Sequence, residues 1–374
     1  MTWHRCMRIA LYNLTTTTKY GGVESFVWDL ARELARRDHA VTIIGGVGER
    51  RECVPGVRIW TFPFIDRYRI QAIPPLRRAY AEAKLLERLS LAVAALPELV
   101  RGGYDIIHLQ KPYDIGPALL ARRLGGARVV LGCHGEDFYP GDALLAPRVD
   151  AAVSCSRFNA RTVAARYGFE PEVVFNGIDT ALFHPVPPDP AFPRREGMFR
   201  LLWVGRLQPW KGVDIAIHAL QYIPCAELLV AGDGETRADL ERLVANLSLA
   251  DRVRFLGSLP RGRLPALYAT ADLLLATSFA SETFGIGLVE AQACGLPVVA
   301  SRFGGFPEVI DEGCTGLLVP PRDPEALAAA VRELLDDPAR RVAMAGAAPA
   351  WAARFAWPAV TDRVEAAYQA ALRR

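Results

Sequence analysis

Two patterns of hydrophobic and polar positions alternate along the first half of the chain. Short apolar runs, typical of buried strands, are followed by stretches in which apolar residues recur every three or four positions, as on one face of a helix. Phe26, Leu30 and Leu34 form such a face in a helix expected over 23–37, and a longer helical region is expected over about 76–100. The predicted strands of this half cover 8–12, 41–44, 57–60, 105–109, 128–131 and 151–154.

The alternation starts again in the second half. Its predicted strands cover 201–204, 227–231, 253–256, 272–275, 297–300 and 316–319. Strands that alternate with helices form parallel sheets covered on both faces. We therefore predict the α/β class, with two doubly wound, Rossmann-like domains. Such sheets bind ligands beyond the carboxyl ends of their strands, so two of them suggest a cleft between the domains.

Prolines mark the predicted domain boundary. Five of them lie between Phe183 and Phe199, a density that interrupts helices and strands. We predict a first domain over 1–184, a linker over 185–198 and a second domain over 199–357. The length of 374 residues agrees with this division, since one domain is expected for each ~150 residues.

Composition and charge exclude several classes of protein. With 51% hydrophobic and 23% charged residues the composition is globular, and a net charge of +3 is too small for a protein that coats nucleic acid. The seven cysteines lack the spacing of zinc or redox sites, which favours a reducing, cytoplasmic compartment. The longest apolar stretch, 89–100, is broken by Pro97 and Glu98 and falls short of the ~20 residues that span a bilayer. Since the start of the sequence also lacks a leader pattern, we expect a soluble protein.

The segment 281–295 carries the most informative candidate residues. A helix that begins near Phe284 and Gly285 would offer unpaired N–H groups and the positive end of its dipole to a phosphate. Glu282 precedes this helix start and Glu290 follows it by about two turns, so each carboxylate could hold hydroxyls on one side of a diphosphate. Taken alone, each glutamate is more typical of a solvated or capping residue.

Two cations follow the first predicted strand of the second domain. Arg206 and Lys211 lie in the segment 205–212, at the same edge of the sheet, and together they suit a diphosphate leaving group. The alternative is a surface turn whose cations face water. Gly304 and Gly305 follow a third strand and permit close backbone approach, so three segments converge on one edge.

The first domain offers weaker signals. Gly22 lies in a strand-to-helix glycine loop that could approach a phosphate or serve packing alone. His134 follows a predicted strand and should face the ligand, unless it is a structural histidine. Lys111, Tyr113 and Asp114 follow another strand and border a candidate acceptor site.

Three motifs are missing from the sequence. There is no Asp-x-Asp pair, which many nucleotide-sugar enzymes use to hold Mn or Mg, and no P-loop. The segment Gly232-Asp233-Gly234 comes close to a dinucleotide-binding loop, but Arg237 occupies its third glycine position, which weakens the dehydrogenase hypothesis.

These motifs together resemble those of the retaining glycosyltransferases of family 4, which have the two-domain GT-B fold. The resemblance covers nearly the whole chain and rests on Glu282 and Glu290 at E-x7-E spacing, supported by Gly205-Arg206, Lys211-Gly212, Gly304-Gly305, Pro307-Glu308 and Asn176-Gly177-Ile178-Asp179. It implies transfer of a sugar from a nucleotide diphosphate sugar to a hydroxyl of a sugar, a glycolipid or a small metabolite. It further implies retention of anomeric configuration, and no metal or other cofactor.

The resemblance also implies residue roles. Arg206 and Lys211 would bind the donor diphosphate, Glu282 the donor sugar and Glu290 the ribose. The residues implied in catalysis are Glu282, His134, Arg206 and Lys211, and those implied in donor binding are Gly22, Arg206, Lys211, Phe284, Gly285 and Glu290. The first domain would bind the acceptor, with candidates Lys111, Tyr113 and Asp137, and would be completed by a returning helix over 358–374.

Other hypotheses stay open at this point. A nucleotide-sugar epimerase on a similar fold and a non-catalytic nucleotide-sugar-binding protein are the alternatives, followed at a distance by a nicotinamide dehydrogenase. Between 67 and 128, eleven basic residues outnumber five acidic ones. This excess of basic residues raises the hypothesis of peripheral contact with a membrane. The amphipathic surface would combine basic residues with nearby leucines: Arg77, Arg78, Lys84 and Arg88 with Leu85, Leu86 and Leu89. A solvated helix with its apolar stripe in the core is the more economical interpretation.

Overall fold

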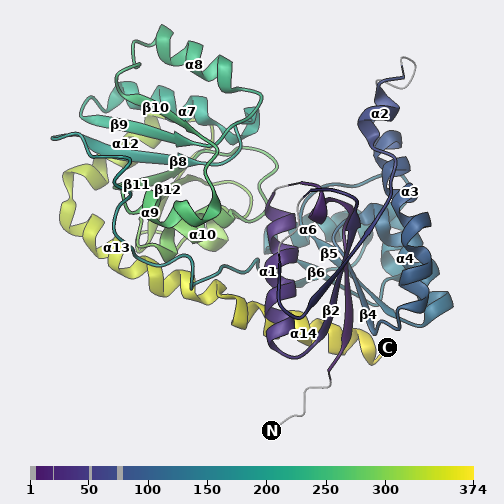
Figure 1. The fold of residues 1–374 in the computed structure, drawn as a ribbon. Helices are drawn as coiled ribbons and strands as arrows, with labels where there is room; N and C mark the ends of the chain where they lie inside the picture. The colour runs from purple at the N-terminus through teal and green to yellow at the C-terminus, as the bar shows by residue number, and fades with distance from the viewer. Residues whose placement is uncertain (1–5, 20, 50–52, 74–78) are drawn as a thin grey trace. The chain divides into compact units, whose positions relative to one another are not determined.

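The chain divides into two compact units in the computed structural model, which describes residues 6–19, 21–49, 53–73 and 79–374. The first unit comprises the chain up to Gly177 together with Trp357–Arg374, and the second comprises Ile178–Ala356. The final segment, yellow in Figure 1, thus ends within the first unit as helix α14 (Trp357–Leu372). Arg77 and Arg78 lie outside the described residues.

A seven-stranded parallel sheet forms the centre of the first unit, in the order β3-β2-β1-β4-β5-β6-β7. The six strands predicted from the sequence are all present, and only the two-residue β7 was not predicted. The strands are β1 (Arg8–Tyr12), β2 (Ala40–Gly46), β3 (Val57–Phe62), β4 (Ile106–Leu109), β5 (Arg128–Cys133), β6 (Ala151–Ser154) and β7 (Glu172–Val173).

Helices cover both faces of this sheet (Figure 1). Side chains alternate along β1, so Ile9 and Leu11 join one apolar cluster while Ala10 and Tyr12 join the other. The first cluster includes α1 (Gly22–Arg36), with Phe26, Leu30 and Leu34 buried as predicted, and α14. The second cluster includes α3 (Tyr80–Arg101), α4 (Ile115–Gly125) and α6 (Arg157–Tyr167). The remaining short helices are α2 (Arg67–Gln71) and α5 (Asp142–Leu145).

The second unit repeats this architecture with six parallel strands in the order β10-β9-β8-β11-β12-β13. Its strands are β8 (Phe199–Val204), β9 (Ala226–Ala231), β10 (Val253–Gly257), β11 (Leu273–Ala276), β12 (Val298–Ser301) and β13 (Gly316–Val319). Its helices are α7 (Val213–Ala219), α8 (Arg237–Asn246), α9 (Leu264–Tyr268), α10 (Ile286–Ala293), α11 (Phe306–Val309), α12 (Pro324–Asp336) and α13 (Pro338–Ala352). The predicted α/β class with two Rossmann-like domains is confirmed.

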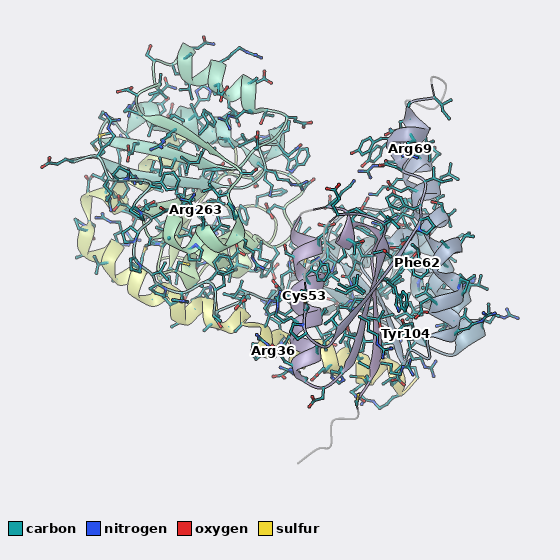
Figure 2. All side chains as sticks on the ribbon, in the orientation of Figure 1. Arg36, Cys53, Phe62, Arg69, Tyr104 and Arg263 are labelled. Atoms are coloured by element: carbon teal, nitrogen blue, oxygen red, sulfur yellow. The ribbon has the colours of Figure 1, made fainter. Side chains whose placement is uncertain are left out.

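The proline-rich segment 185–198 lies within the second unit, whereas the sequence suggested a linker there. The backbone N–H of Asp189 donates to the carbonyl oxygen of Ala266 at 3.0 Å, and the Asp189 carboxylate pairs with Arg263, labelled in Figure 2, at 2.5 Å. Phe192 is buried beside them. The segment therefore follows the surface of the second unit, because these contacts fix it at several points.

The chain passes between the units at two adjacent places. Ile178 pairs with Ala356, and its N–H donates to the carbonyl oxygen of Phe355 at 2.8 Å. Gly177 lies against the indole ring of Trp357. The Asn176-Gly177-Ile178-Asp179 motif therefore marks the first passage, seven residues before the boundary expected at 184.

Candidate active site

The strand order of each sheet reverses beside its first strand. In the second unit the reversal lies between β8 and β11, and in the first unit between β1 and β4. Ligands of doubly wound sheets bind beyond the carboxyl ends of the strands at such a point. Residues that bind ligands or take part in catalysis are therefore expected in the loops that follow these strands.

In the second unit, the loop after β8 is tied to the end of β11. The Thr277 hydroxyl donates to the carbonyl oxygen of Gly212 at 2.6 Å and accepts from the indole N–H of Trp203 at 3.2 Å. The backbone N–H of Phe279 also donates to the carbonyl oxygen of Trp210 at 3.0 Å. These contacts fix the position of the Lys211 backbone from both sides.

Lys211 and Glu282 meet in this loop region. The Lys211 Nζ lies 2.5 Å from Glu282 Oε2, and the Ser278 hydroxyl donates to the same oxygen at 3.2 Å. Their side chains are 22% and 15% exposed, so both are partly accessible. Two residues predicted separately from the sequence thus form one pair, while the third, Arg206, is exposed at the start of the loop.

Glycines shape the backbone beside this pair. Gly285 has φ +93° at the start of α10, and a Cβ there would lie 2.7 Å from the Phe306 ring. Gly304 has φ +59°, and a Cβ there would overlap the carbonyl oxygen of Glu282. The loops after β11 and β12 therefore pack backbone against backbone, which holds Glu282 beside the first turn of α10.

Two other residues that were predicted to bind the nucleotide sugar, Glu290 and Phe284, are buried. Glu290 on α10 is 7% exposed, and Arg261 Nη2 lies 3.3 Å from its carboxylate. The Arg261 guanidinium also stands over the Phe183 ring, 5.2 Å from its centre. Phe284 is buried with its ring edge toward Phe355. Arg261 was not predicted from the sequence, because a single arginine at the start of a short 3-10 helix has no local signature.

In the first unit, His134 follows β5 and contacts a buried glutamine. Its Nε2 lies 2.7 Å from Oε1 of Gln110, which follows β4, and the Phe26 ring packs against the imidazole at 4.7 Å between centres. Burial lowers the pKa of His134 to about 3, and Lys111 and His108 act in the same direction. His134 is therefore a neutral side chain at physiological pH.

Gly22 begins α1, and the described residues leave space beside it. Apart from its chain neighbours and its own helix backbone, none of the described atoms would lie within 4 Å of a Cβ built on Gly22. The Thr15 hydroxyl lies 2.5 Å from Oε1 of Glu24, in the first turn of the same helix. The backbone at this helix start can therefore be approached closely, as a phosphate-binding loop requires.

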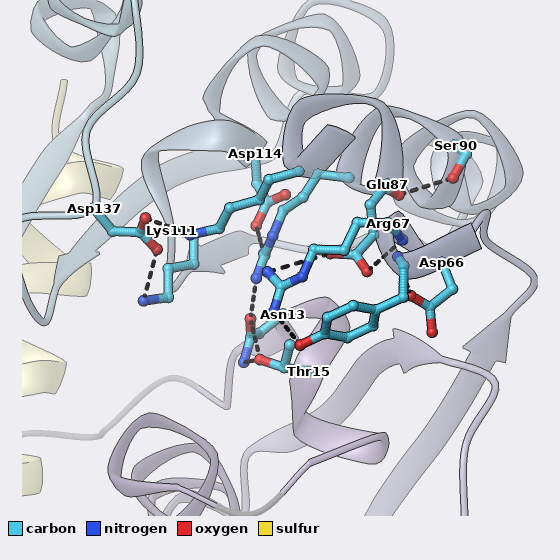
Figure 3. A network of polar contacts seen from close by, with 12 residues as sticks. Asn13, Thr15, Asp66, Arg67, Glu87, Ser90, Lys111, Asp114 and Asp137 are labelled. Atoms are coloured by element: carbon cyan, nitrogen blue, oxygen red, sulfur yellow. Dashed lines mark hydrogen bonds and ion pairs between the residues drawn. The ribbon is translucent and has the colours of Figure 1, made fainter. Parts of the chain in front are cut away.

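The predicted acceptor residues gather around Asp137 (Figure 3). Lys111 Nζ lies 3.2 Å from the Asp137 carboxylate, and Lys84 of α3 pairs with the same group. Tyr113 stacks on Tyr139 at 4.7 Å between ring centres, with the Lys84 ammonium 4.9 Å from the centre of the Tyr113 ring. Although burial raises the pKa of Asp137, the two lysines hold it below its ordinary value.

Two basic residues of α3, Lys84 and Arg88, face inward, whereas the hypothesis of membrane contact placed them on the surface. Lys84 is 8% and Arg88 2% exposed, and Arg88 pairs with Asp114 at 2.6 Å. Leu86 and Leu89 are instead exposed. Lys84 and Arg88 share a helix face with the buried Leu91, since positions three and four apart lie together, and that spacing could have revealed their direction.

Across the described ranges, no group of three or more histidine, cysteine, aspartate or glutamate side chains is placed to hold a metal ion. None of the helices in the described part of the chain has both the length and the apolar character needed to cross a membrane.

Comparison with known proteins decides the family. Residues 20–182 match the model described as Glycosyltransferase Family 4, and residues 189–351 match that of Glycosyl transferases group 1. The D-inositol 3-phosphate glycosyltransferase of Thermobispora bispora is 30% identical over 391 residues, which cover 95% of this chain and 91% of that protein. The chain belongs to glycosyltransferase family 4.

Other family 4 relatives include the GDP-mannose-dependent alpha-(1-6)-phosphatidylinositol monomannoside mannosyltransferase of Mycolicibacterium smegmatis. It is 34% identical over 262 residues, which cover 64% of this chain and 68% of that enzyme. Solved structures show the same fold. Sucrose-phosphate synthase from Thermosynechococcus elongatus aligns over 97% of this family 4 chain and 98% of its own, with a TM-score of 0.80 and 22% identity. The predicted glycosyltransferase with a GT-B fold is therefore confirmed.

Proposed function

We propose that this glycosyltransferase moves a sugar from a nucleotide diphosphate sugar to an acceptor hydroxyl with retention of anomeric configuration. The pairing of Lys211 with Glu282 beside the first turn of α10 carries the proposal. It sets a cation suited to a diphosphate next to a carboxylate suited to sugar hydroxyls, at the point where the strand order reverses.

The donor roles follow from charge and exposure. Lys211 and the exposed Arg206 would meet the diphosphate, the N–H groups at the start of α10 would add donors, and the Glu290 carboxylate would accept from the ribose hydroxyls. The name of the Mycolicibacterium relative, which specifies GDP-mannose, supports a donor of this class. Lys211 and Arg206 would then stabilise the charge that develops on the departing diphosphate.

The route to retention is carried over from the family resemblance. We propose that the acceptor hydroxyl attacks on the face from which the nucleotide departs, without a carboxylate nucleophile and without a metal ion. His134 would contact the transferred sugar. Glu282 would orient the sugar hydroxyls, since Ser278 and Lys211 fix its carboxylate from two directions.

For the acceptor, the cluster around Asp137 supports an acidic polyol. Lys84 and Lys111 share this one carboxylate, which leaves one net positive charge among the three groups. Several relatives are named for D-inositol 3-phosphate. We place the reaction in the cytoplasm, a location supported by seven cysteines that form no disulfide.

Calorimetric titration tests the donor site. UDP, GDP and ADP, and then their common sugars, would be added, in parallel titrations with and without EDTA, to the wild type, to Lys211→Ala and to the control Arg242→Ala on the exposed face of α8. We expect selective binding by the wild type and the control, and affinity at least tenfold lower in Lys211→Ala. No binding by the folded wild type, or equal binding by Lys211→Ala, would overturn the assignment. Loss of binding with EDTA would contradict metal independence.

A product analysis tests the reaction itself. The selected donor would be incubated with inositol phosphates, free sugars and glycolipids, and the anomeric proton of the product read by NMR. Retention requires the same anomer as in the donor. The inverted anomer would refute the proposed mechanism.

A further inference from the structure

A hollow lined by arginines lies at the end of α4 in the first unit. Its volume is about 730 Å³, within the range of pockets that hold small organic molecules. Arg122 and Arg123 belong to the last turn of α4. Arg128 begins β5 and Arg148 ends a short 3-10 helix over Ala146–Arg148, so three segments bring four guanidinium groups to one hollow.

The hollow and the candidate active site lie at opposite ends of the strands of the first sheet. Arg128 is the first residue of β5, whereas His134 follows its last residue. Six steps along a strand separate the two residues, which amounts to about 20 Å at roughly 3.3 Å per residue. A ligand in the hollow would therefore occupy a site of its own, away from His134 and from Lys111, which follow β5 and β4.

One buried carboxylate holds two of the arginines in place. Asp150 is 6% exposed and lies 3.1 Å from Nη1 of Arg122 and 3.3 Å from Nη1 of Arg128. Nη1 of Arg122 also donates to the carbonyl oxygen of Arg148 at 2.8 Å, which ties the 3-10 helix to α4. Within the described part of the chain, Nε and Nη2 of Arg122 and Arg128 meet no acceptor, so both arginines keep donors for a ligand.

The other two arginines carry charge that is not neutralised. Arg123 and Arg148 are exposed, and among the residues that the structure describes neither side chain has an ion-pair or hydrogen-bond partner. Four guanidinium groups and the carboxylate of Asp150 leave three net positive charges among these five groups. Like charges around one hollow repel one another, so an anion that enters it lowers their energy.

The dipole of α4 accounts for only part of this charge. Its carbonyl end stabilises cations in the last turn, which explains Arg122 and Arg123 without any ligand. Arg128 and Arg148 come from other segments, and this effect gives no reason for their position. The gathering of cations from three segments is therefore better explained by a bound anion.

We infer that this hollow is a second anion site, which binds the phosphate group of an organic phosphate. A guanidinium engages phosphate oxygens through two parallel N–H groups, and the hollow has room for the body of the molecule as well. Leu119 and Leu120 line it beside the arginines, with Leu120 46% exposed, and they offer apolar surface to that body. The phosphate belongs either to a soluble metabolite or to a phospholipid headgroup.

A double variant tests the site without disturbing the fold. Arg123→Gln with Arg148→Gln removes the two cations whose side chains have no partner in the described chain, so thermal melting should stay unchanged. The matched control is Arg36→Gln with Arg161→Gln, which removes two charges from exposed positions of α1 and α6 in the same unit.

Two experimental arms identify the source of the phosphate. All proteins would be full chains that also carry Lys111→Ala and Lys211→Ala, so that the proposed acceptor and donor sites do not capture the probe. One arm titrates fructose 1,6-bisphosphate in a calorimeter at low ionic strength, where exposed charges are least screened. The other arm floats the protein with vesicles of phosphatidylcholine, alone or mixed in equal amounts with phosphatidylglycerol.

We expect binding in at least one arm, at least tenfold weaker with Arg123→Gln and Arg148→Gln and within twofold of the parent in the control. Binding of the bisphosphate alone assigns a soluble ligand, binding to the anionic vesicles alone assigns a lipid headgroup, and binding of both assigns the phosphate group that they share. No binding in either arm, or equal losses in the two variant pairs, would overturn the inference. Because neither arm measures sugar transfer or depends on Lys211, its failure is distinguishable from failure of the proposed function.

Discussion

The guanidinium of Arg88 lies 2.6 Å from the carboxylate of Asp114, and the two side chains are only 2% and 0% exposed. Arg88 also donates to the Asn13 side-chain oxygen at 3.3 Å, as Figure 3 shows around Asn13 and Asp114. The pair joins α3 to the loop after β4. Burial raises the pKa of Asp114 while Arg88 lowers it, so each charge depends on the other for its stability.

Arg88→Met should therefore destabilise the fold by about 3–5 kcal/mol, since it leaves a buried carboxylate without its counter-ion. Replacing both partners, as Arg88→Met with Asp114→Leu, should cost clearly less than the sum of the single changes. Urea unfolding measures these free energies, with Arg242→Met on the exposed face of α8 as control. Additive losses in the double variant would contradict the prediction.

Glu282→Gln should separate nucleotide binding from sugar binding. The change removes a negative charge 2.5 Å from Lys211, so affinity for the nucleotide diphosphate alone should stay equal or rise. The additional affinity contributed by the sugar should fall by roughly tenfold, because a hydrogen bond to a charged group is worth about 1.5–3 kcal/mol. Parallel calorimetry with the diphosphate and its sugar gives both values. A tenfold loss for the diphosphate alone would disprove the arrangement.

Gly304→Ala should destabilise the second domain by about 2 kcal/mol or more, because φ is positive there and a Cβ would overlap the Glu282 carbonyl oxygen. Donor affinity should fall with it. Gly346→Ala is the matched control. That glycine lies in α13, and outside its own helix no described atom lies within 4 Å of a Cβ built on it. Alanine there should raise the free energy of unfolding by about 0.5–1 kcal/mol. Equal stability of the two variants would rule out the proposed packing of the loops.

Stability should decrease as pH falls below about 6.5. Burial lowers the pKa of His108 from 6.5 to about 3, so between these values the unfolded chain binds a proton that the folded chain does not. The contribution of His108 to this loss should reach about 2 kcal/mol between pH 6.5 and 5, and His134, whose pKa burial also lowers to about 3, should add to it. The free energy of unfolding, measured with urea across this pH range, should change less with pH in His108→Leu than in the wild type. His184→Asn is the control. The same slope in His108→Leu would show that other groups cause the decrease.

Local patterns in the sequence were sufficient for most of the fold. The strands and the inward face of α1 follow from short-range periodicity, which depends only on neighbouring residues. The segment 185–198 was harder, because Phe192 and the ion pair of Asp189 with Arg263 join positions far apart in the sequence. The prolines predict that the backbone of this segment is irregular, but they do not predict which residues the segment packs against.

The candidate site shows the same division. Glycines and charges directly after strands were identified because chain order alone puts them at one edge of a sheet. Gln110, Lys84 and Arg261 were missed or misplaced because their roles depend on the side chain each one meets, at His134, Asp137 and Glu290. Roles of individual residues in binding stay predictions until the experiments above are done.

The double passage of the chain has a consequence for biosynthesis. Trp357, Val360, Val364 and Tyr368 of α14 belong to the same buried cluster as Ile9 and Leu11 of β1. Strand β1 therefore leaves the ribosome long before α14, which covers its apolar face, and residues 178–356 can complete their own core in between. During translation the apolar face of β1 that α14 covers thus stays exposed while the whole second unit is synthesised.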